Sequence, residues 1–223
     1  MRQYLKFWPL AVPVVLFPIY AATGIFWFRC AIIVFLLFYV LWLLFARVPK
    51  EHRKKTAFIP AAFFFSIIGD LFLHFDEGRA PLFIAGVAVY FVAHMSYIGF
   101  TLRRGKVNWW MMGLLTALFT IYFIVLLVPN ISDKGILVAV FLYILVSCFS
   151  VSAASGMPLG AWMDRLAKGL VISGISSLLF SDFVLSLHDF VGVQTGYFLM
   201  LPTFYLSQML VTAALIHLFC EKN

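Results

Sequence analysis

Long apolar runs restrict this chain to a membrane. Each crossing of a bilayer by a helix requires about 20 mostly apolar residues. Eight stretches fit, at roughly 5–24, 30–46, 56–75, 81–102, 109–128, 135–154, 169–188 and 197–219. Only 11% of the 223 residues are charged, whereas soluble domains are nearer about 25%. We therefore predict an all-α membrane protein that forms one polytopic domain over residues 1–223, with about eight transmembrane helices.

The basic residues predict an orientation. An even number of spans leaves both termini on one side, and placing that side in the cytoplasm puts 13 Lys and Arg inside and three outside. The 13 are Arg2, Lys6, Arg47, Lys50, Arg53, Lys54, Lys55, Arg103, Arg104, Lys106, Arg165, Lys168 and Lys222, and the three are Arg29, Arg79 and Lys134. This bias follows the positive-inside rule, so both termini are expected in the cytoplasm and, in a bacterium, the protein in the inner membrane. The net charge of +7 then serves orientation and lipid contact, not nucleic-acid binding.

Two aspartates, Asp70 and Asp182, lie deep inside apolar stretches. A carboxylate in hydrocarbon costs several kcal/mol unless it is neutral or paired, so each marks a candidate functional site. Both lie roughly 14 residues, or about 20 Å, from the cytoplasmic ends of their spans, and are expected to meet inside the bundle. Their matching positions have two open explanations: two parallel four-helix repeats, or chance similarity of apolar helices of equal length.

Other polar residues recur at helical spacing near the two aspartates. Steps of three and four residues place them on single helix faces, and we expect these faces to enclose one polar cavity with Asp70 and Asp182. The histidine and tyrosines among these candidates could instead only pack in the protein core, without a functional role. His74 and His188, near the outer interface, are expected to be solvated. The cavity candidates are Ser66, Tyr90, His94, Tyr97, Tyr205 and Gln208.

Several classes of chemistry have no counterpart in the chain. There is no HExxH or GxSxG motif, and the three cysteines have no metal-ligand spacing, so no metal site is predicted. Intramembrane aspartyl proteases carry Gly-x-Gly-Asp, but Ile67 stands where the first glycine belongs, and no Pro-Ala-Leu follows. A proton-coupled small-molecule or lipid transporter, which also uses membrane carboxylates, stays open as an alternative, as does a non-catalytic scaffold.

The order of these motifs resembles the YhhN-like lysoplasmalogenase family. The resemblance rests on Gly69-Asp70-x-x-Leu73, on Gly86 and His94-x-x-Tyr97, on Ser181-Asp182-x-x-Leu185 and on Tyr205-x-x-Gln208. It implies an enzyme that cleaves the vinyl ether bond of a lysophospholipid substrate, the lysoplasmalogen, to a fatty aldehyde and glycerophosphoethanolamine or glycerophosphocholine. It also implies no cofactor, and Asp70 and Asp182 as the catalytic pair.

The residue types suit acid-catalysed cleavage of a vinyl ether. Two close carboxylates in a low-dielectric site are expected to share one proton. One would then donate a proton while the other stabilises the cation and activates water. His94, Tyr97, Tyr205 and Gln208 are expected to hold the glycerol hydroxyl or the water, and Arg103 and Arg104 are candidates for binding phosphate.

Overall fold

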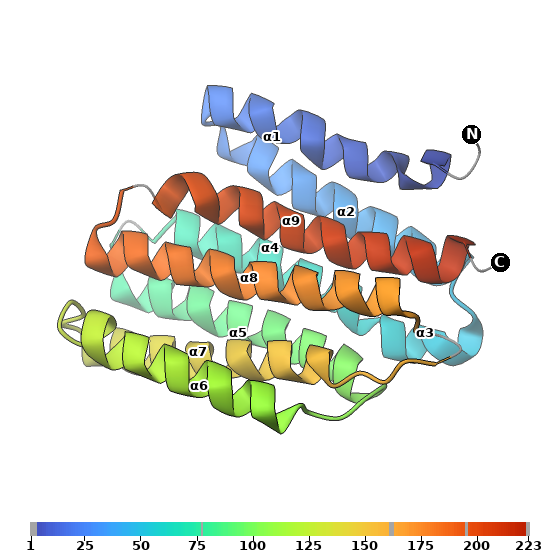
Figure 1. Ribbon diagram of the computed structural model, residues 1–223. Coiled ribbons are helices and arrows are strands. Elements are labelled where there is room, and N and C mark those ends of the chain that lie inside the picture. Colours follow the sequence, from blue (N-terminus) through green and yellow to red (C-terminus); the bar gives the residue numbers. More distant parts are fainter. Residues whose placement is uncertain (1–3, 77, 161–162, 195, 222–223) are drawn as a thin grey trace.

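The computed structural model is a bundle of long helices that lie side by side and run across the view of Figure 1. It describes residues 4–76, 78–160, 163–194 and 196–221, and these ranges contain no strand. The helices are η1 (Tyr4–Leu10), α1 (Ala11–Thr23), α2 (Phe26–Ala46), α3 (Lys50–Thr56), α4 (Phe58–His74), α5 (Ala80–Leu102), α6 (Trp109–Tyr122), η2 (Phe123–Leu127), α7 (Lys134–Ser155), α8 (Arg165–Val191), α9 (Gly196–Ile216) and η3 (His217–Glu221).

Within the described ranges, seven helical segments are long and apolar enough to cross a membrane, so the chain is a multi-pass integral membrane protein. The first predicted span, 5–24, coincides with the continuous helical run of η1 and α1 (Tyr4–Leu10 and Ala11–Thr23), whose apolar part, Phe7–Thr23, is shorter than the other seven. Pro9 lies inside η1 and Pro18 inside α1, and each lacks the N–H that a regular helix uses, yet the helical run continues through both. This segment packs against α2 and α9 at the edge of the bundle.

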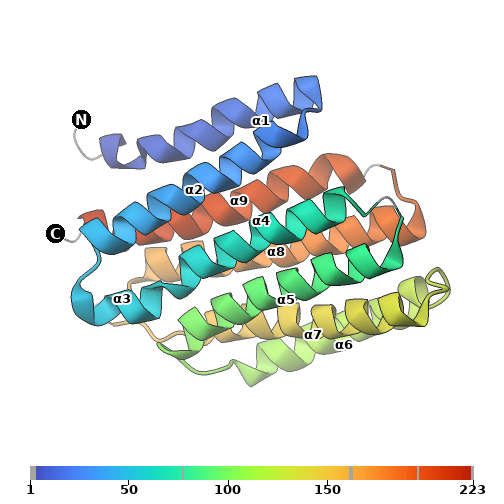
Figure 2. The same cartoon turned by 180° about the vertical axis from the view of Figure 1, so that it is seen from behind.

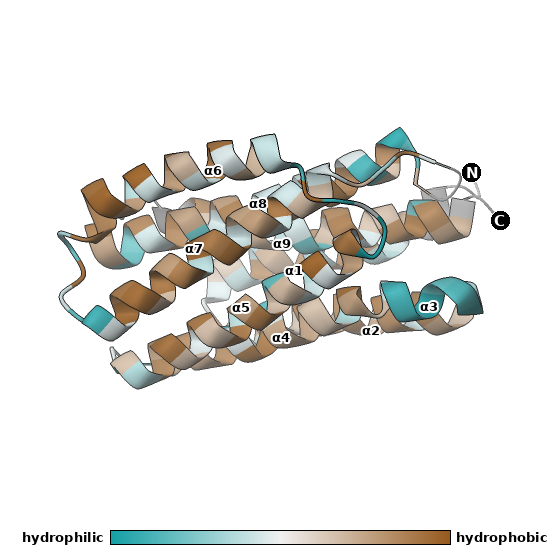
Figure 3. Ribbon diagram, turned by 90° about the horizontal axis from the view of Figure 1, so that it is seen from below, coloured by the Kyte–Doolittle hydropathy of each residue, from teal (hydrophilic) through white to brown (hydrophobic). Residues whose placement is uncertain are grey.

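Basic residues gather at one end of the bundle. The helix α3, the loop 103–108 and the connection 156–164 lie at this end, together with the first and last described residues (Figures 1 and 2). The residues between the predicted spans 30–46 and 56–75 include most of α3, the most hydrophilic helix in Figure 3. Arg53 in α3 donates to the carbonyls of Val48 (3.0 Å) and Phe45 (2.8 Å) and so caps the C-terminal end of α2. We call this the basic end; that it faces the cytoplasm stays a prediction.

Side-chain caps set where three of the long helices begin. Asn108 accepts from the N–H of Met111 at the start of α6, and Asp164 accepts from Ala167 at the start of α8. Asp133 accepts from two N–H groups at the start of α7. Such acceptors satisfy donors that would otherwise have no partner in the first turn. The caps therefore fix the register in which α7 and α8 present their polar residues to the bundle interior.

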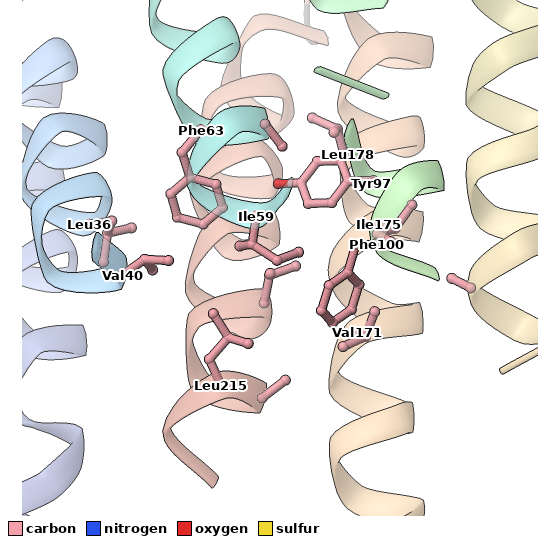
Figure 4. Close-up of a cluster of buried hydrophobic side chains, with 14 of the residues drawn as sticks. Leu36, Val40, Ile59, Phe63, Tyr97, Phe100, Val171, Ile175, Leu178 and Leu215 are labelled. Carbon is pink, nitrogen blue, oxygen red and sulfur yellow. The ribbon is translucent and has the colours of Figure 1, made fainter. Parts of the chain in front are cut away.

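The half of the bundle nearer the basic end is filled by apolar side chains. Figure 4 shows this cluster between α2, α4, α5, α8 and α9. Its labelled residues are all buried: Leu36, Val40, Ile59, Phe63, Tyr97, Phe100, Val171, Ile175, Leu178 and Leu215. None of them lines the cavity described below, so this packing separates that cavity from the basic end.

Each aspartate-bearing helix packs closely on the helix that follows it, α4 on α5 and α8 on α9. Two glycines permit the approach. A Cβ added at Gly69 would lie 2.6 Å from a ring carbon of Tyr90, and one at Gly174 would lie 3.0 Å from the backbone oxygen of Ser207. The two helix pairs are alike in this respect, but an internal duplication stays a prediction.

Candidate functional site

A cavity of about 290 Å³ occupies the half of the bundle away from the basic end. Its walls come from seven helices, α2 and α4 to α9, and it reaches the loop after α4 and the last turn of α8. Most of the wall is apolar, with Phe83, Val87, Phe119, Phe183 and Leu201 among the lining residues. Nearly half of the lining residues are polar or charged, and this mixture suits the binding of a small amphipathic molecule.

Asp182 lies on the wall of the cavity, with its side chain 16% exposed. The hydroxyl of Tyr143 donates to its Oδ2 over 2.8 Å. His94 Nε2 lies 3.3 Å from the same oxygen, 3.1 Å from the Tyr143 hydroxyl and 3.2 Å from Ser147 Oγ. Helices α5 and α7 thus place three polar side chains, His94, Tyr143 and Ser147, beside the carboxylate from α8, and we call these four residues the Asp182 cluster.

Asp70 is held by different partners and is fully buried. Arg29 binds it with two donors, Nη2 to Oδ1 over 2.5 Å and Nε to Oδ2 over 3.2 Å. The hydroxyl of Tyr90 donates to Oδ1 as well. Arg29 and Tyr90 line the cavity, whereas Asp70 lies behind them and does not. We call these three residues the Asp70 cluster.

In the described part of the chain no hydrogen bond joins Asp70 to Asp182. The expected pair of carboxylates sharing one proton is therefore replaced by two separate clusters. The reason is Arg29, which sequence analysis assigned to an outer loop. Helix α2 begins at Phe26 and not at residue 30, so the guanidinium lies inside the bundle and compensates Asp70, as buried charges require.

The other predicted site residues lie at different depths. Tyr97 donates to Oε1 of Gln208 over 3.1 Å, one turn nearer the basic end than His94. Tyr205 is buried and packs edge-on against Phe17. None of Tyr97, Gln208 and Tyr205 lines the cavity. Ser66 donates to the carbonyl of Ala62 in its own helix, so its hydroxyl is satisfied within α4.

The mouth of the cavity carries four more ionisable side chains. His74 is exposed, as expected, and stacks on Phe26 with ring centres 3.7 Å apart. His188 is half-buried and lies 2.8 Å from the carboxylate of Asp189. Asp76 completes the set. Among the described residues, no three His, Cys, Asp or Glu side chains are placed to hold a metal ion.

Sequence reasoning missed Arg29, Tyr143 and Ser147. Arg29 was read as an orientation signal because it precedes an apolar run. Tyr143 and Ser147 are separated by four residues on α7, the same spacing as Tyr90 and His94 on α5. That polar stripe was a usable signal. Arg103 and Arg104, named as candidates for phosphate, lie at the basic end, where Arg104 donates to Thr56 and to a carbonyl of α3.

Comparison with known proteins gives a family and no closer relative. No curated protein and no solved structure matches the chain. The YhhN family matches residues 24–215, a range that begins directly after α1 and contains every residue that lines the cavity. The chain, with its two aspartate clusters beside a membrane-embedded cavity, belongs to the YhhN family.

Proposed function

We propose that this protein is a lysoplasmalogenase, an enzyme that hydrolyses the vinyl ether bond of a lysoplasmalogen. Membership of the YhhN family supports a hydrolase of this type. The observation that carries the proposal is the Asp182 cluster: a carboxyl group on the wall of an apolar cavity, aligned by a tyrosine hydroxyl and next to a buried histidine. The products are a fatty aldehyde and glycerophosphoethanolamine or glycerophosphocholine.

The reaction begins with transfer of a proton to the β-carbon of the vinyl ether. The carbon–carbon double bond supplies the electron pair for the new C–H bond, and a resonance-stabilised oxocarbenium ion forms. Water adds to the cationic carbon and loses a proton, which gives a hemiacetal. The hemiacetal then breaks its bond to the glycerol oxygen, releasing aldehyde and alcohol, so the sum consumes one water. The step that creates charge is slow, as in glycoside hydrolysis through a similar cation.

Asp182 is the group we assign to this proton transfer. As the free acid it donates the proton, and as the carboxylate it stabilises the adjacent cation and accepts a proton from the attacking water. Tyr143 holds the carboxyl in place through its 2.8 Å hydrogen bond. The ring of His94 is fully buried. Its Nε2 lies within hydrogen-bond distance of both the Asp182 carboxyl and the Tyr143 hydroxyl.

The shape of the cavity suits a lysophospholipid. An apolar wall accepts the first carbons of an alkenyl chain, and the cavity mouth with its histidines and aspartates is polar. The substrate is amphipathic in the same way, with the vinyl ether at the boundary between its apolar and polar parts. Asp182 lies among both kinds of residue: Leu179, Phe183 and Leu185 on its own helix are apolar lining, and Ser181 and Ser186 are polar lining.

The test is hydrolysis by the purified protein in detergent micelles. With 1-alkenyl-lysophosphatidylethanolamine as substrate, mass spectrometry is expected to detect the fatty aldehyde. In D₂O the aldehyde should carry one deuterium on the carbon next to the carbonyl, because that carbon receives the proton. The saturated 1-alkyl analogue should be stable. Absence of aldehyde from folded protein would refute the proposal, and coupled uptake of a solute into proteoliposomes would then support transport.

A matched pair of variants tests the assignment of Asp182. Asp182→Asn removes the acid and is expected to lower kcat by about 10²–10⁴-fold, the usual contribution of a positioned general acid. Asp189→Asn makes the same change on the same helix, at the mouth of the same cavity, and is expected to keep most of the activity. Equal loss in both variants would show that Asp182 is not the proton donor.

A further inference from the structure

The guanidinium of Arg29 has more donors than the protein uses. An arginine offers five N–H groups in one plane. Two of them bind Asp70, from Nε and Nη2. The described part of the chain shows no other hydrogen bond from Arg29, whose side chain is 15% exposed and lines the cavity. Three donors therefore remain for a ligand inside the cavity.

In the Asp70 cluster, Arg29 is the one charged side chain that a ligand in the cavity can contact. Asp70 is fully buried, and both of its oxygens accept hydrogen bonds from Arg29 or Tyr90. Its carboxylate makes the buried cation tolerable, since an unpaired charge in this position would cost several kcal/mol. The two-point contact also fixes the plane of the guanidinium, so that its free edge is held in one orientation.

The charges around the cavity leave one place for an anion. Arg29 is the only Lys or Arg among the described lining residues. Apart from three tyrosines, the remaining ionisable groups of the lining are the carboxylates Asp76, Asp182 and Asp189 and the two histidines of the mouth, one of which pairs with Asp189. An anionic ligand would be repelled by the carboxylates and attracted to the free edge of Arg29. Arginine binds phosphate through two parallel N–H bonds, which this edge can supply.

We infer that Arg29 is the anchor for the phosphate group of a single-chain phospholipid, and that Asp70 and Tyr90 are positioning residues that hold it. This inference rests on the proposed function for the identity of the lipid. It separates the two aspartates: Asp182 acts on the bond that breaks, whereas Asp70 acts only through Arg29. A bound phosphate at the α2 wall would place the lipid against the α8 wall, where Asp182 lies.

The experiment measures binding without chemistry. The probe is 1-O-hexadecyl-glycerophosphoethanolamine, which has no vinyl ether, and it is compared with phosphate-free 1-O-hexadecylglycerol by calorimetric titration of the full-length protein in micelles. Wild-type protein is expected to bind the phospholipid at least about 10-fold tighter, equivalent to about 1.4 kcal/mol. Arg29→Gln should remove this preference and leave binding of hexadecylglycerol unchanged, while Arg29→Lys should restore part of it.

Further variants separate anchoring from folding. Arg29→Gln combined with Asp70→Asn removes both charges, so no unpaired ion is left buried, and this variant should fold and still lack the preference. Asp70→Asn alone should weaken phospholipid binding although Asp70 touches no ligand. In hydrolysis assays Arg29→Lys should raise KM more than it lowers kcat. Arg104→Gln, at the basic end, is the control and should bind like wild type.

Two results would overturn the inference. The first is an undiminished preference for the phospholipid in the double variant. The second is binding of inorganic phosphate as tightly as the phospholipid, which would assign the site to a free anion. A preference that depends on Arg29 in a protein without hydrolase activity would support the anchor and refute only the proposed reaction.

Discussion

Replacement of Gly69 by alanine tests whether the glycine before Asp70 exists to admit Tyr90. The added Cβ would lie 2.6 Å from Cδ2 and 2.7 Å from Cε2 of the Tyr90 ring. Carbon atoms pack at about 3.5–4.0 Å, so the ring has to retreat by about 1 Å. Its hydroxyl donates to Asp70, which is fully buried, so a retreat of the ring weakens or removes this hydrogen bond.

The expected cost combines three terms. Overpacking of a filled site costs about 1–3 kcal/mol, and a lost hydrogen bond to a charged group costs about 1.5–3 kcal/mol. Replacing glycine by alanine inside a helix stabilises the helix by about 1 kcal/mol. Gly69→Ala should therefore lower the free energy of unfolding by about 1.5–5 kcal/mol. It should also lower the activity, because Tyr90 helps to hold Arg29 and Asp70 together.

The assay is unfolding of the purified variants in mixed micelles by added SDS, followed by helical circular dichroism. Gly113→Ala is the control: Gly113 is an exposed glycine of α6 with no atom near an added Cβ, and its replacement should raise stability slightly. Combining Gly69→Ala with Tyr90→Val should cost no more than Tyr90→Val alone, because the smaller side chain leaves room. Equal stability of Gly69→Ala and Gly113→Ala would refute the steric reasoning.

Three other predictions concern the reaction, the packing and the topology. Tyr143→Phe removes the 2.8 Å hydrogen bond to Asp182 and should reduce kcat by about 10–100-fold with little change in KM; an unchanged kcat would show that Tyr143 only packs. Gly174→Ala places a methyl group against Val211 and the backbone of α9 and should lower stability by about 1–3 kcal/mol in the SDS assay. A green fluorescent protein fused to the C-terminus should fluoresce and an alkaline phosphatase fused there should be inactive, if the basic end is cytoplasmic; active phosphatase would reverse the orientation.

The long helices were predictable because each bilayer crossing imposes the same length and apolar composition. Helix α7 begins within one residue of the prediction and α5 ends on it. The start of α2 was predicted four residues too late, and that small error had a large effect, since it moved Arg29 out of the bundle. The first predicted span also falls on helical residues, because η1 and α1 together cover Tyr4–Thr23 although prolines lie inside both.

The candidate site was predictable in its residues more than in its pairings. Asp70, Asp182, Tyr90 and His94 stand out as polar groups in apolar sequence, and the structure places all four in the two clusters around the cavity. Which carboxylate meets which partner depends on helix rotation and on contacts between distant residues, such as His94 and Asp182, 88 positions apart. Spacing along one helix carries no information about such contacts.

The pairing of Arg29 with Asp70 also implies an order of events during synthesis. Helix α2 precedes α4, so the guanidinium enters the membrane before the carboxylate that neutralises it is made. Arg29 is the fourth residue of α2, close enough to the helix end for its long side chain to reach the polar interface while it waits. Asp70 is fully buried and has a short side chain without that reach. Lateral release of α4 into the lipid before it meets α2 would leave this carboxyl group unpaired and favour its protonated form, so early association of the two helices is the route that keeps Asp70 ionised.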